Sequence, residues 1–240
     1  MVRILKSVVL AVVATCFAVA LGLIALRVSG HSAERFVERA VDAVPTSLTG
    51  SLGRKESESV IENWPPAKGQ RFPDLELQDQ NGEAVRLSDF VGELILVEYA
   101  AVPCEGCQAF AGGKRHGGFA GFRVQRGLDS IEDYASRYAG VDLGEDVVFV
   151  QILLYGKDVK APAPNEVTAW AKHFQMDRTK NEIVLCGTSS LLSRETYDLI
   201  PGFQLIDRDF IVRSGSCGHR PQDNLYTDLL PLLGRLARER

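Results

Sequence analysis

An apolar segment that ends in two closely spaced cysteines constrains the fold of this chain more than any other feature. Residues 94–99 (Leu-Ile-Leu-Val-Glu-Tyr) have the composition of a buried β-strand, and the chain then runs through Pro103 into Cys104-Glu105-Gly106-Cys107. We expect a strand, a turn and a helix that begins at the cysteines. Two thiols at this spacing can close a reversible disulfide, and a nearby helix N-terminus favours the attacking thiolate. The strand also contains one acid, Glu98.

The N-terminal segment predicts a membrane anchor, which we assign to residues 7–28. Ser7 to Leu26 contains no charged residue, and a helix needs about 20 apolar residues to cross a bilayer. Arg3 and Lys6 precede this stretch, so residues 1–6 are expected in the cytoplasm and the rest of the chain on the extracytoplasmic side. A cleaved signal peptide is the alternative, but its apolar core is usually shorter, which favours an uncleaved signal-anchor.

Charge and cysteine content describe the environment expected for the rest of the chain. The formal net charge is −4, and an acidic balance argues against a nucleic-acid partner. Cys16 is expected to be a small apolar residue of the anchor rather than a lipid-modified cysteine, because Thr15 suits such a modification poorly. The other four cysteines are then exposed to an oxidising periplasmic or extracellular compartment, where disulfides form.

Residues 29–67 are predicted to connect the anchor to a compact domain. Spaced apolar residues in 31–43 favour a short amphipathic helix, and residues 45–66 are rich in Ser, Gly, Pro and charge, as linkers are. We place the compact domain at residues 68–240.

Residue periodicity predicts an α/β domain over residues 68–240. The expected elements are a hairpin (75–78 and 83–87), a helical turn (89–91), a strand (94–99), a short helix that carries Cys107 and is interrupted at Gly112, a helix (128–138), a strand (147–155), a helix capped by Asn165 (166–174), a strand (183–186), a hairpin (203–206 and 210–212) and a closing helix kinked at Pro231 (226–237). Strands first alternate with helices and a hairpin comes late. We therefore expect a mixed central sheet flanked by helices.

Three segments in this order resemble the thioredoxin superfamily, in its redoxin branch of membrane-tethered thiol–disulfide oxidoreductases and peroxiredoxin-like proteins. They are Gly69 to Asp74 with the hairpin and residues 87–90 that follow, Ile95 to Cys107, and Ile200 to Asp209. The resemblance covers residues 68–236. It implies a thioredoxin-like fold with an N-terminal β-hairpin extension.

The same resemblance implies a set of site residues. We expect no cofactor and no metal. Cys104 matches the attacking cysteine, which forms a mixed disulfide with a protein thiol or disulfide, and Cys107 matches the resolving cysteine. Glu98 resembles the family's buried acid, usually Asp, which exchanges a proton with the inner thiol. Pro201 matches the cis-proline that faces the two sulfurs and leaves nearby backbone free to pair with an extended substrate.

The chain departs from the family pattern at several positions around these residues. Pro103 replaces the usual Trp, Gly202 replaces the Thr that often follows the cis-proline, and Glu105-Gly106 replaces Gly-Pro between the cysteines. The charge of Glu105 should oppose the thiolate somewhat. These changes bear on the redox potential and the partner more than on the reaction type.

Other interpretations of the cysteines remain open at the level of sequence. Cys104 and Cys107 can form a static disulfide, or half of a zinc site completed by Cys186, Cys217 or His219, although the strand-to-helix context favours redox exchange. Cys186 and Cys217 can form a structural disulfide, stay unpaired, or act as an auxiliary dithiol. The first two of these are favoured over the third.

Two alternative functions use the same cysteines. A peroxiredoxin-like peroxidase needs a Pro and a Thr before its cysteine, and Val97 and Ala101 stand there instead. The related copper or assembly chaperones place three residues between their cysteines and add a distal His, whereas only two residues intervene here.

The basic residues of 112–123 are expected in a solvated loop, or as a docking edge for an acidic partner.

Overall fold

The computed structural model describes residues 61, 64–219 and 221–239, all of which belong to one compact unit, Glu58–Arg240. The expected cytoplasmic residues 1–6, the anchor at 7–28, the helix at 31–43 and nearly all of the linker lie outside the described residues. Within the described part of the chain, no helix combines the length and apolarity needed to span a bilayer.

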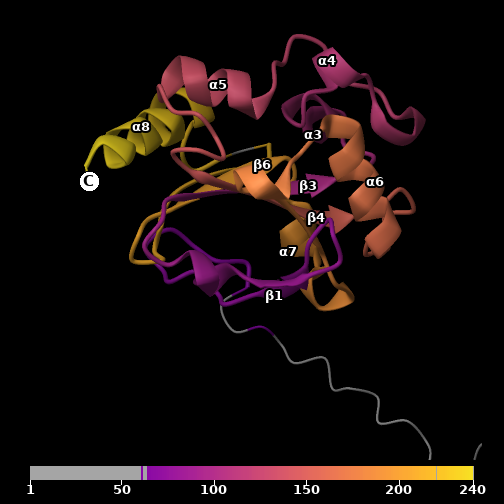
Figure 1. Cartoon of the computed structure of the whole chain (residues 1–240), viewed down its shortest axis with the longest axis horizontal. Helices are drawn as coiled ribbons and strands as arrows, with labels where there is room; N and C mark the ends of the chain where they lie inside the picture. The colour runs from indigo at the N-terminus through magenta and orange to yellow at the C-terminus, as the bar shows by residue number, and fades with distance from the viewer. Residues whose placement is uncertain (1–60, 62–63, 220, 240) are drawn as a thin grey trace, which may run out of the picture. The chain divides into compact units, whose positions relative to one another are not determined.

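A five-stranded mixed sheet forms the centre of the domain (Figure 1). Its order is β5 (Glu182–Cys186), β4 (Val148–Tyr155), β3 (Ile95–Ala101), β6 (Gly202–Ile206) and β7 (Val212–Cys217). The pairs β3–β4 and β4–β5 are parallel, whereas β3–β6 and β6–β7 are antiparallel. This arrangement confirms the expected mixed α/β sheet. It also makes the strand before the cysteines the central one.

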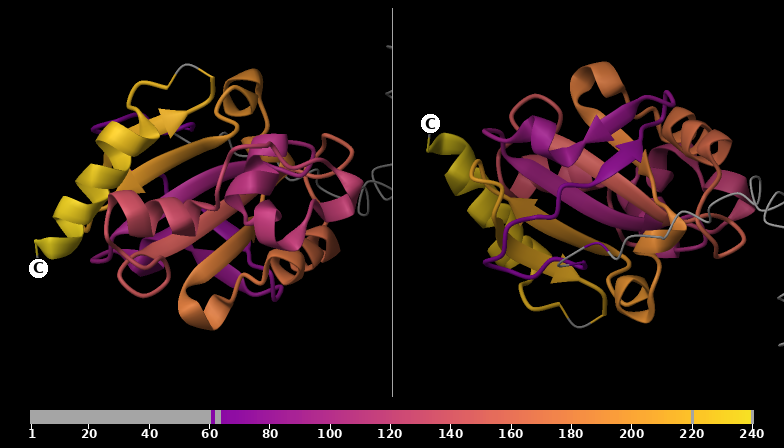
Figure 2. Two further views of the ribbon diagram at one scale, coloured as in Figure 1. Left: turned by 90° about the horizontal axis from the view of Figure 1, so that it is seen from above. Right: turned by 90° about the horizontal axis from the view of Figure 1, so that it is seen from below.

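Helices and a separate hairpin cover the two faces of this sheet (Figures 1 and 2). The hairpin consists of β1 (Glu76–Gln78) and β2 (Ala84–Arg86), as expected. The α-helices are α3 (Glu105–Phe110), α4 (Gly113–His116), α5 (Ile131–Tyr138), α6 (Pro164–Phe174), α7 (Arg194–Tyr197) and α8 (Leu230–Arg238). The short helical turns are η1 (Leu87–Phe90), η2 (Phe119–Gly121), η3 (Arg178–Lys180), η4 (Ser189–Leu191) and the π-helical η5 (Leu225–Leu229).

Alternate residues of β3 pack into different parts of the core, because successive side chains of a strand point to opposite faces. Ile95, Val97 and Tyr99 pack with the β1–β2 hairpin side, whereas Leu96 packs with α5 and α8. Ala100 packs with α6. Every residue of β3 and β4 is buried, which explains their nearly continuous apolar sequences. Glu98, an even-numbered residue, shares the helix-covered face with Leu96 and Ala100.

Several predicted element boundaries were wrong for local reasons. Helix α5 begins at Ile131 instead of 128, because the Ser130 hydroxyl caps it by accepting from the Asp133 amide at 3.2 Å. Helix α6 begins at Pro164, a residue type that suits the first helical position, so Asn165 lies inside the helix and does not cap it.

The last hairpin and the closing helix also differ from expectation. Phe210 has a positive φ of 65° and belongs to the turn, so β7 begins only at Val212 and continues to Cys217. The closing segment begins with the π-helical η5, capped by Asn224, and continues as α8. Pro231 is in the first turn of α8, directly after η5, where a missing amide is tolerated.

Candidate functional site

The turn after β3 places both cysteines at the start of α3, as expected from the sequence. Cys104 is the N-terminal capping residue, and its sulfur accepts a hydrogen bond from the Cys107 backbone amide at 3.1 Å. The Cys104 amide in turn donates to the Ala101 carbonyl at 3.1 Å. Cys104 is half-buried, whereas Cys107 is fully buried. Cys104 is therefore the thiol that a large substrate can reach first.

The two thiols differ strongly in acidity. The hydrogen bond with the Cys107 side chain is the main cause that lowers the pKa of Cys104, and the Cys107 and Gly106 backbone amides add to it. Burial and the charge of Glu105 oppose this effect. Burial raises the pKa of Cys107 well above that of a free thiol, and the interaction with Cys104 raises it further. The arrangement favours a thiolate on Cys104 and a protonated thiol on Cys107.

Glu98 is a buried acid in the middle of the central strand, not a carboxylate at the sheet margin. Its side chain is fully buried, and its Oε2 accepts a hydrogen bond from Gln151 Nε2 at 2.8 Å. Its Oε1 is buried and has no hydrogen-bond partner within the described part of the chain. Burial raises the pKa of Glu98 well above its usual value, and the charge of Cys104 raises it further, while Gln151 opposes both. Glu98 in turn raises the pKa of Cys107.

Pro201 lies against the cysteine turn, next to Gly106. The Ile200–Pro201 peptide bond is cis. A Cβ added to Gly106 would be only 3.1 Å from Pro201 Cγ, so the missing side chain of Gly106 allows this close approach. Pro201 and Cys104 line the same groove.

Gly202, one of the departures from the family pattern, has a steric reason in this chain. A Cβ at this position would lie 2.7 Å from Cys217 Cα and 2.9 Å from Cys217 Cβ, and it would also collide with the Leu199 carbonyl. Gly202 and Cys217 are directly paired between β6 and β7. The close approach of the Leu199 carbonyl and of Cys217 on β7 therefore excludes the Thr of the family pattern.

The groove beside Cys104 has a volume of about 400 Å³. Apolar and polar residues from several separate segments line it, including Tyr155, Val159, Tyr197 and His219. Val159 and Tyr197 are 53% and 56% exposed, unusually high values for large apolar side chains. The sequence suggested His219 only as a possible zinc ligand, and it is the folded loop after β7 that brings it to this groove.

Cys186 and Cys217 lie on the two outer strands of the sheet, which rules out a disulfide between them. Four strand spacings of about 4.8 Å separate β5 from β7, or roughly 19 Å, whereas a disulfide needs Cα atoms within about 7 Å. Both are free thiols. Burial raises the pKa of Cys217 to about 12 and also raises that of Cys186. This strand order excludes both the structural disulfide and the auxiliary dithiol, and of the alternatives only the unpaired residues remain.

The described residues contain no cluster of three or more His, Cys, Asp or Glu side chains suited to hold a metal ion. The Cys186 sulfur instead donates to the Pro162 carbonyl, and the Cys217 sulfur to the Phe203 carbonyl. Neither thiol completes a zinc site with Cys104 and Cys107.

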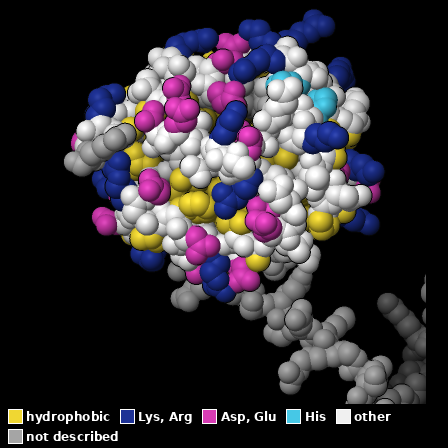
Figure 3. Space-filling model, viewed as in Figure 1, with side chains coloured by type: hydrophobic (Ala, Val, Ile, Leu, Met, Phe, Trp, Pro, Cys, Tyr) yellow, Lys and Arg dark blue, Asp and Glu magenta, His cyan; other side chains and the backbone are white. Residues whose placement is uncertain are grey.

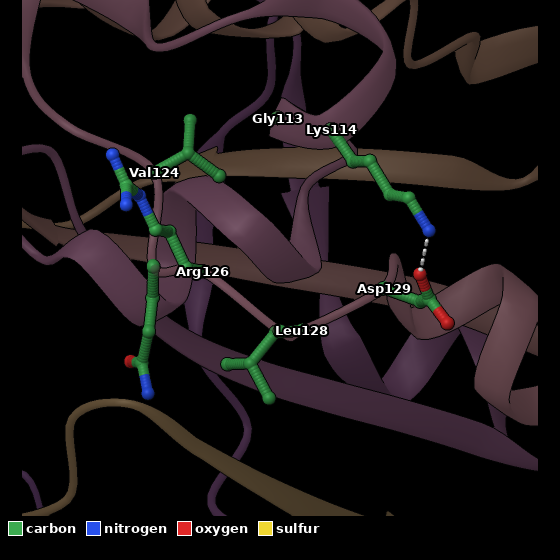
Figure 4. Close-up of a pocket in the computed structure, with 8 residues that line it drawn as sticks. Gly113, Lys114, Val124, Arg126, Leu128 and Asp129 are labelled. Atoms are coloured by element: carbon green, nitrogen blue, oxygen red, sulfur yellow. Dashed lines mark hydrogen bonds and ion pairs between the residues drawn. The ribbon is translucent and has the colours of Figure 1, made fainter.

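Lys114 and Arg115 belong to the short helix α4 rather than to an extended loop, and both have acidic neighbours within the domain. Lys114 donates to Asp129 at 2.6 Å across a hollow of about 440 Å³ (Figure 4). Arg115 pairs with Glu132 and Asp133 of α5. Figure 3 shows basic and acidic side chains interspersed over the face that it displays. No cysteine or histidine lines this second hollow, so the thiol groove remains the candidate site.

Comparisons with known proteins give fold neighbours only. No family model and no curated protein matches the chain. Solved structures similar to it include an uncharacterized conserved protein from Geobacillus kaustophilus (16% identity, 72% of this chain and 84% of that chain, TM-score 0.47). Others are the thioredoxin domain of a thiol-disulfide oxidoreductase from Bacteroides vulgatus (17%, 67% and 93%, 0.40) and a SCO1/SenC family lipoprotein from Bacillus anthracis (17%, 70% and 96%, 0.44). The sheet order and strand directions by themselves show a mixed α/β domain.

Proposed function

We propose that this thioredoxin-like protein is a thiol–disulfide oxidoreductase that exchanges disulfides with protein partners through Cys104 and Cys107. One observation carries the proposal: an accessible thiol of lowered pKa and a buried thiol of raised pKa lie in one turn, beside a buried acid. A static disulfide has no use for this difference in acidity, whereas stepwise exchange requires it.

The exchange proceeds in two displacement steps. The Cys104 thiolate attacks one sulfur of the partner disulfide, forms a mixed disulfide and releases the first partner thiolate. Cys107 then loses its proton to the Glu98 carboxylate, and its thiolate attacks the Cys104 sulfur. The Cys104–Cys107 disulfide forms and the second partner thiolate leaves. The protein dithiol is oxidised by two electrons and the partner disulfide is reduced by two, and the reverse sequence oxidises a partner dithiol.

Glu98 serves as the proton acceptor and donor for the buried thiol. Cys107 is fully buried, so it needs an internal base to become a nucleophile. Glu98 is buried on the same helix-covered side of β3, and its charge raises the pKa of Cys107, an effect that requires the two groups to lie near each other. A raised pKa brings a carboxyl group toward the range in which it can both take up and return a proton near neutrality.

The groove beside Cys104 receives the partner segment. Pro201 forms one side of the approach to the sulfur, and the exposed apolar side chains of Val159 and Tyr197 line the same hollow. An extended peptide around a partner cysteine fits such a surface, since apolar contacts supply affinity without demanding one sequence. The partner is therefore a protein rather than a small thiol.

We place this reaction on the extracytoplasmic side of a membrane, with residues 7–28 as the tether. The support is the uncharged stretch from Ser7 to Leu26 preceded by Arg3 and Lys6. A tethered dithiol in that compartment exchanges with other exported proteins, in a direction that its redox potential sets.

A copper-binding or assembly role is the second candidate, because His219 lines the same groove as Cys104. Cysteine thiolates with an imidazole are soft ligands that suit Cu(I). The peroxidase alternative gains no such support, since Val97 and Ala101 are buried apolar residues and offer no hydroxyl to a peroxide.

Trapping the mixed disulfide tests the proposal. In the full chain, Cys107→Ser leaves Cys104 able to attack but removes the resolving thiol, so partner proteins should accumulate as adducts that reductant releases. Cys104→Ser is the matched control and should trap none. If the wild-type chain binds one Cu(I) per molecule and exchanges no dithiol, the copper role replaces the oxidoreductase.

A further inference from the structure

Gln151 is a buried amide in the middle of an otherwise apolar strand. It is fully buried in β4, and it lies directly opposite Glu98 in the parallel pairing of β3 with β4. Its strand neighbours Val150 and Ile152 are fully buried apolar residues. A primary amide in such surroundings costs free energy unless its donors and acceptor are satisfied. The amide therefore needs hydrogen-bond partners at this position, where it faces the buried acid.

Trp170 determines which end of the Gln151 amide faces Glu98. Trp170 is fully buried in α6, and its Nε1 donates a hydrogen bond to Gln151 Oε1. An indole N–H can only donate, so it requires the amide oxygen on its own side. The amide nitrogen then points to the other side, where it donates to Glu98 Oε2 at 2.8 Å. The three side chains form a hydrogen-bonded series in which Trp170 of α6 donates to Gln151 of β4, and Gln151 donates to Glu98 of β3.

This hydrogen-bonded series leaves the two carboxyl oxygens of Glu98 in different environments. Oε2 is held as an acceptor by Gln151, while Oε1 is buried without a hydrogen-bond partner in the described part of the chain. Oε1 is therefore the oxygen free to take up a proton. A donor fixed on Oε2 also favours the carboxylate, which is the form needed to accept a proton from Cys107.

We propose that Gln151 and Trp170 are positioning residues that orient the carboxyl group of Glu98 for proton exchange with Cys107. The inference rests on the proposed oxidoreductase function for its consequence, but the orientation itself is a property of three buried side chains. Gln151 keeps the carboxylate accessible, and Trp170 keeps Gln151 from turning its amide oxygen toward Glu98.

The titratable groups acting on Glu98 are few, which makes the effect of Gln151 measurable. The thiol of Cys104 acts on Glu98, and Glu98 acts on Cys107, both from the turn and α3. From β4 and α6 the neighbours are Gln151 and Trp170, which do not titrate. On the β6 side, Glu98 pairs in register with the apolar residue Phe203.

Gln204 offers a matched control for Gln151, because it lies on β6, the strand that pairs with the other edge of β3. It is a buried glutamine of β6 whose Oε1 accepts from the Tyr99 hydroxyl at 2.6 Å and whose Nε2 donates to the Pro66 carbonyl at 2.8 Å. The arrangement copies the donor, amide and acceptor order around Gln151. Its acceptor is a backbone carbonyl instead of a carboxyl group, so its loss should affect stability without affecting Glu98.

The experiment titrates the Glu98 side-chain carboxyl carbon by ¹³C NMR in the reduced full chain, with the signal assigned by its loss in Glu98→Gln. Gln151→Met keeps the length of the side chain and removes its hydrogen bonds. The Glu98 titration should shift upward by about one to two pH units, the size expected for one hydrogen bond to a charged group. Trp170→Phe should shift it in the same direction, and Gln204→Met should leave it in place.

Dithiol exchange measured against pH gives the second readout. In Gln151→Met the rate should fall by up to about tenfold below the new inflection and recover above it, which general damage to the fold would not produce. A Glu98 titration that is unchanged in both Gln151→Met and Trp170→Phe overturns the inference. If Gln151→Met does not fold, Trp170→Phe decides alone. If the titration shifts but no variant or wild type exchanges dithiols, the positioning stands and the oxidoreductase function falls.

Discussion

Replacing Glu98 by Gln should make the reduced protein more stable near neutral pH and should leave the pH dependence of stability much flatter. Burial raises the pKa of Glu98 well above its unfolded value of 4.5. Between these two pKa values the unfolded chain carries a carboxylate and the folded chain a neutral acid. The folded state then binds one proton more, so the free energy of unfolding falls as pH rises through this window. Below the unfolded pKa both states are protonated, and this loss is absent.

The size of the effect follows from the proton count rather than from the folded pKa itself. One additional bound proton in the folded state changes the free energy of unfolding by about 1.4 kcal/mol per pH unit. For a domain of this size, that corresponds to about 3 to 6 °C in Tm per pH unit. Gln cannot ionise, so any cost of fitting its amide beside Gln151 is a constant offset that does not change with pH.

Urea unfolding of the full chain at intervals from pH 4 to pH 8, under reducing conditions, measures this difference. The stability of Glu98→Gln relative to wild type should be constant near pH 4, rise by about 1.4 kcal/mol per unit above about pH 5, and level off at the folded pKa. Glu105→Gln removes an exposed acid of the same turn and controls for the loss of one charge. A difference that stays flat from pH 5 to pH 7 would refute the buried neutral acid.

Three further outcomes test other parts of the site. Cys107→Ala should raise the pKa of Cys104 by about one unit relative to Cys107→Ser, since only Ser keeps a side-chain donor to the Cys104 sulfur. The rate of Cys104 alkylation measured against pH gives this pKa, and equal profiles for the two variants would contradict the prediction. Gly202→Ala should lower the free energy of unfolding by about 1 to 3 kcal/mol through overpacking against Cys217, and unchanged urea unfolding would oppose that explanation. Cys186 and Cys217 should both be alkylated as thiols after mild oxidation and denaturation, whereas a peptide map that links them would contradict the sheet order.

The cysteine turn and the acid behind it could be predicted from the sequence because each depends on local pattern. A continuous apolar run predicts a strand buried on both faces, and β3 is such a strand. The acid in that run had to be buried with it, so Glu98 followed from the same pattern. Pro201 required the resemblance, since a proline alone does not indicate its place opposite a thiol.

What the sequence could not supply was the lateral order of the strands and their register. Cys186 and Cys217 look like a plausible pair until β5 and β7 are found on opposite edges of the sheet. Gln151 carries no signal in its own strand, because its proposed role depends on its position opposite Glu98. His219 reaches the groove only through the folded loop after β7.

The errors in predicted helix boundaries had a different origin. Neighbouring residues can each serve as the start of a helix, and only one of them does. Asn165 is a good capping residue, but Pro164 suits the first turn and extends α6 past it. Ser130 similarly outweighs the apolar Leu128 as the start of α5. The residue at which a helix begins therefore depends on side-chain geometry at single positions, which the periodicity of apolar residues does not describe.

The two buried glutamines beside the central strand have a consequence for folding fidelity. Shifting β3 by one residue against its neighbours would turn every one of its side chains to the opposite face of the sheet. Glu98 would then leave Gln151, and Tyr99 would leave Gln204, so a carboxyl group, a phenol and two amides would all be buried without partners. Apolar residues alone tolerate such a slip far better. The polar contacts on both sides of β3 therefore penalise misaligned pairings and help the chain select one alignment of its sheet.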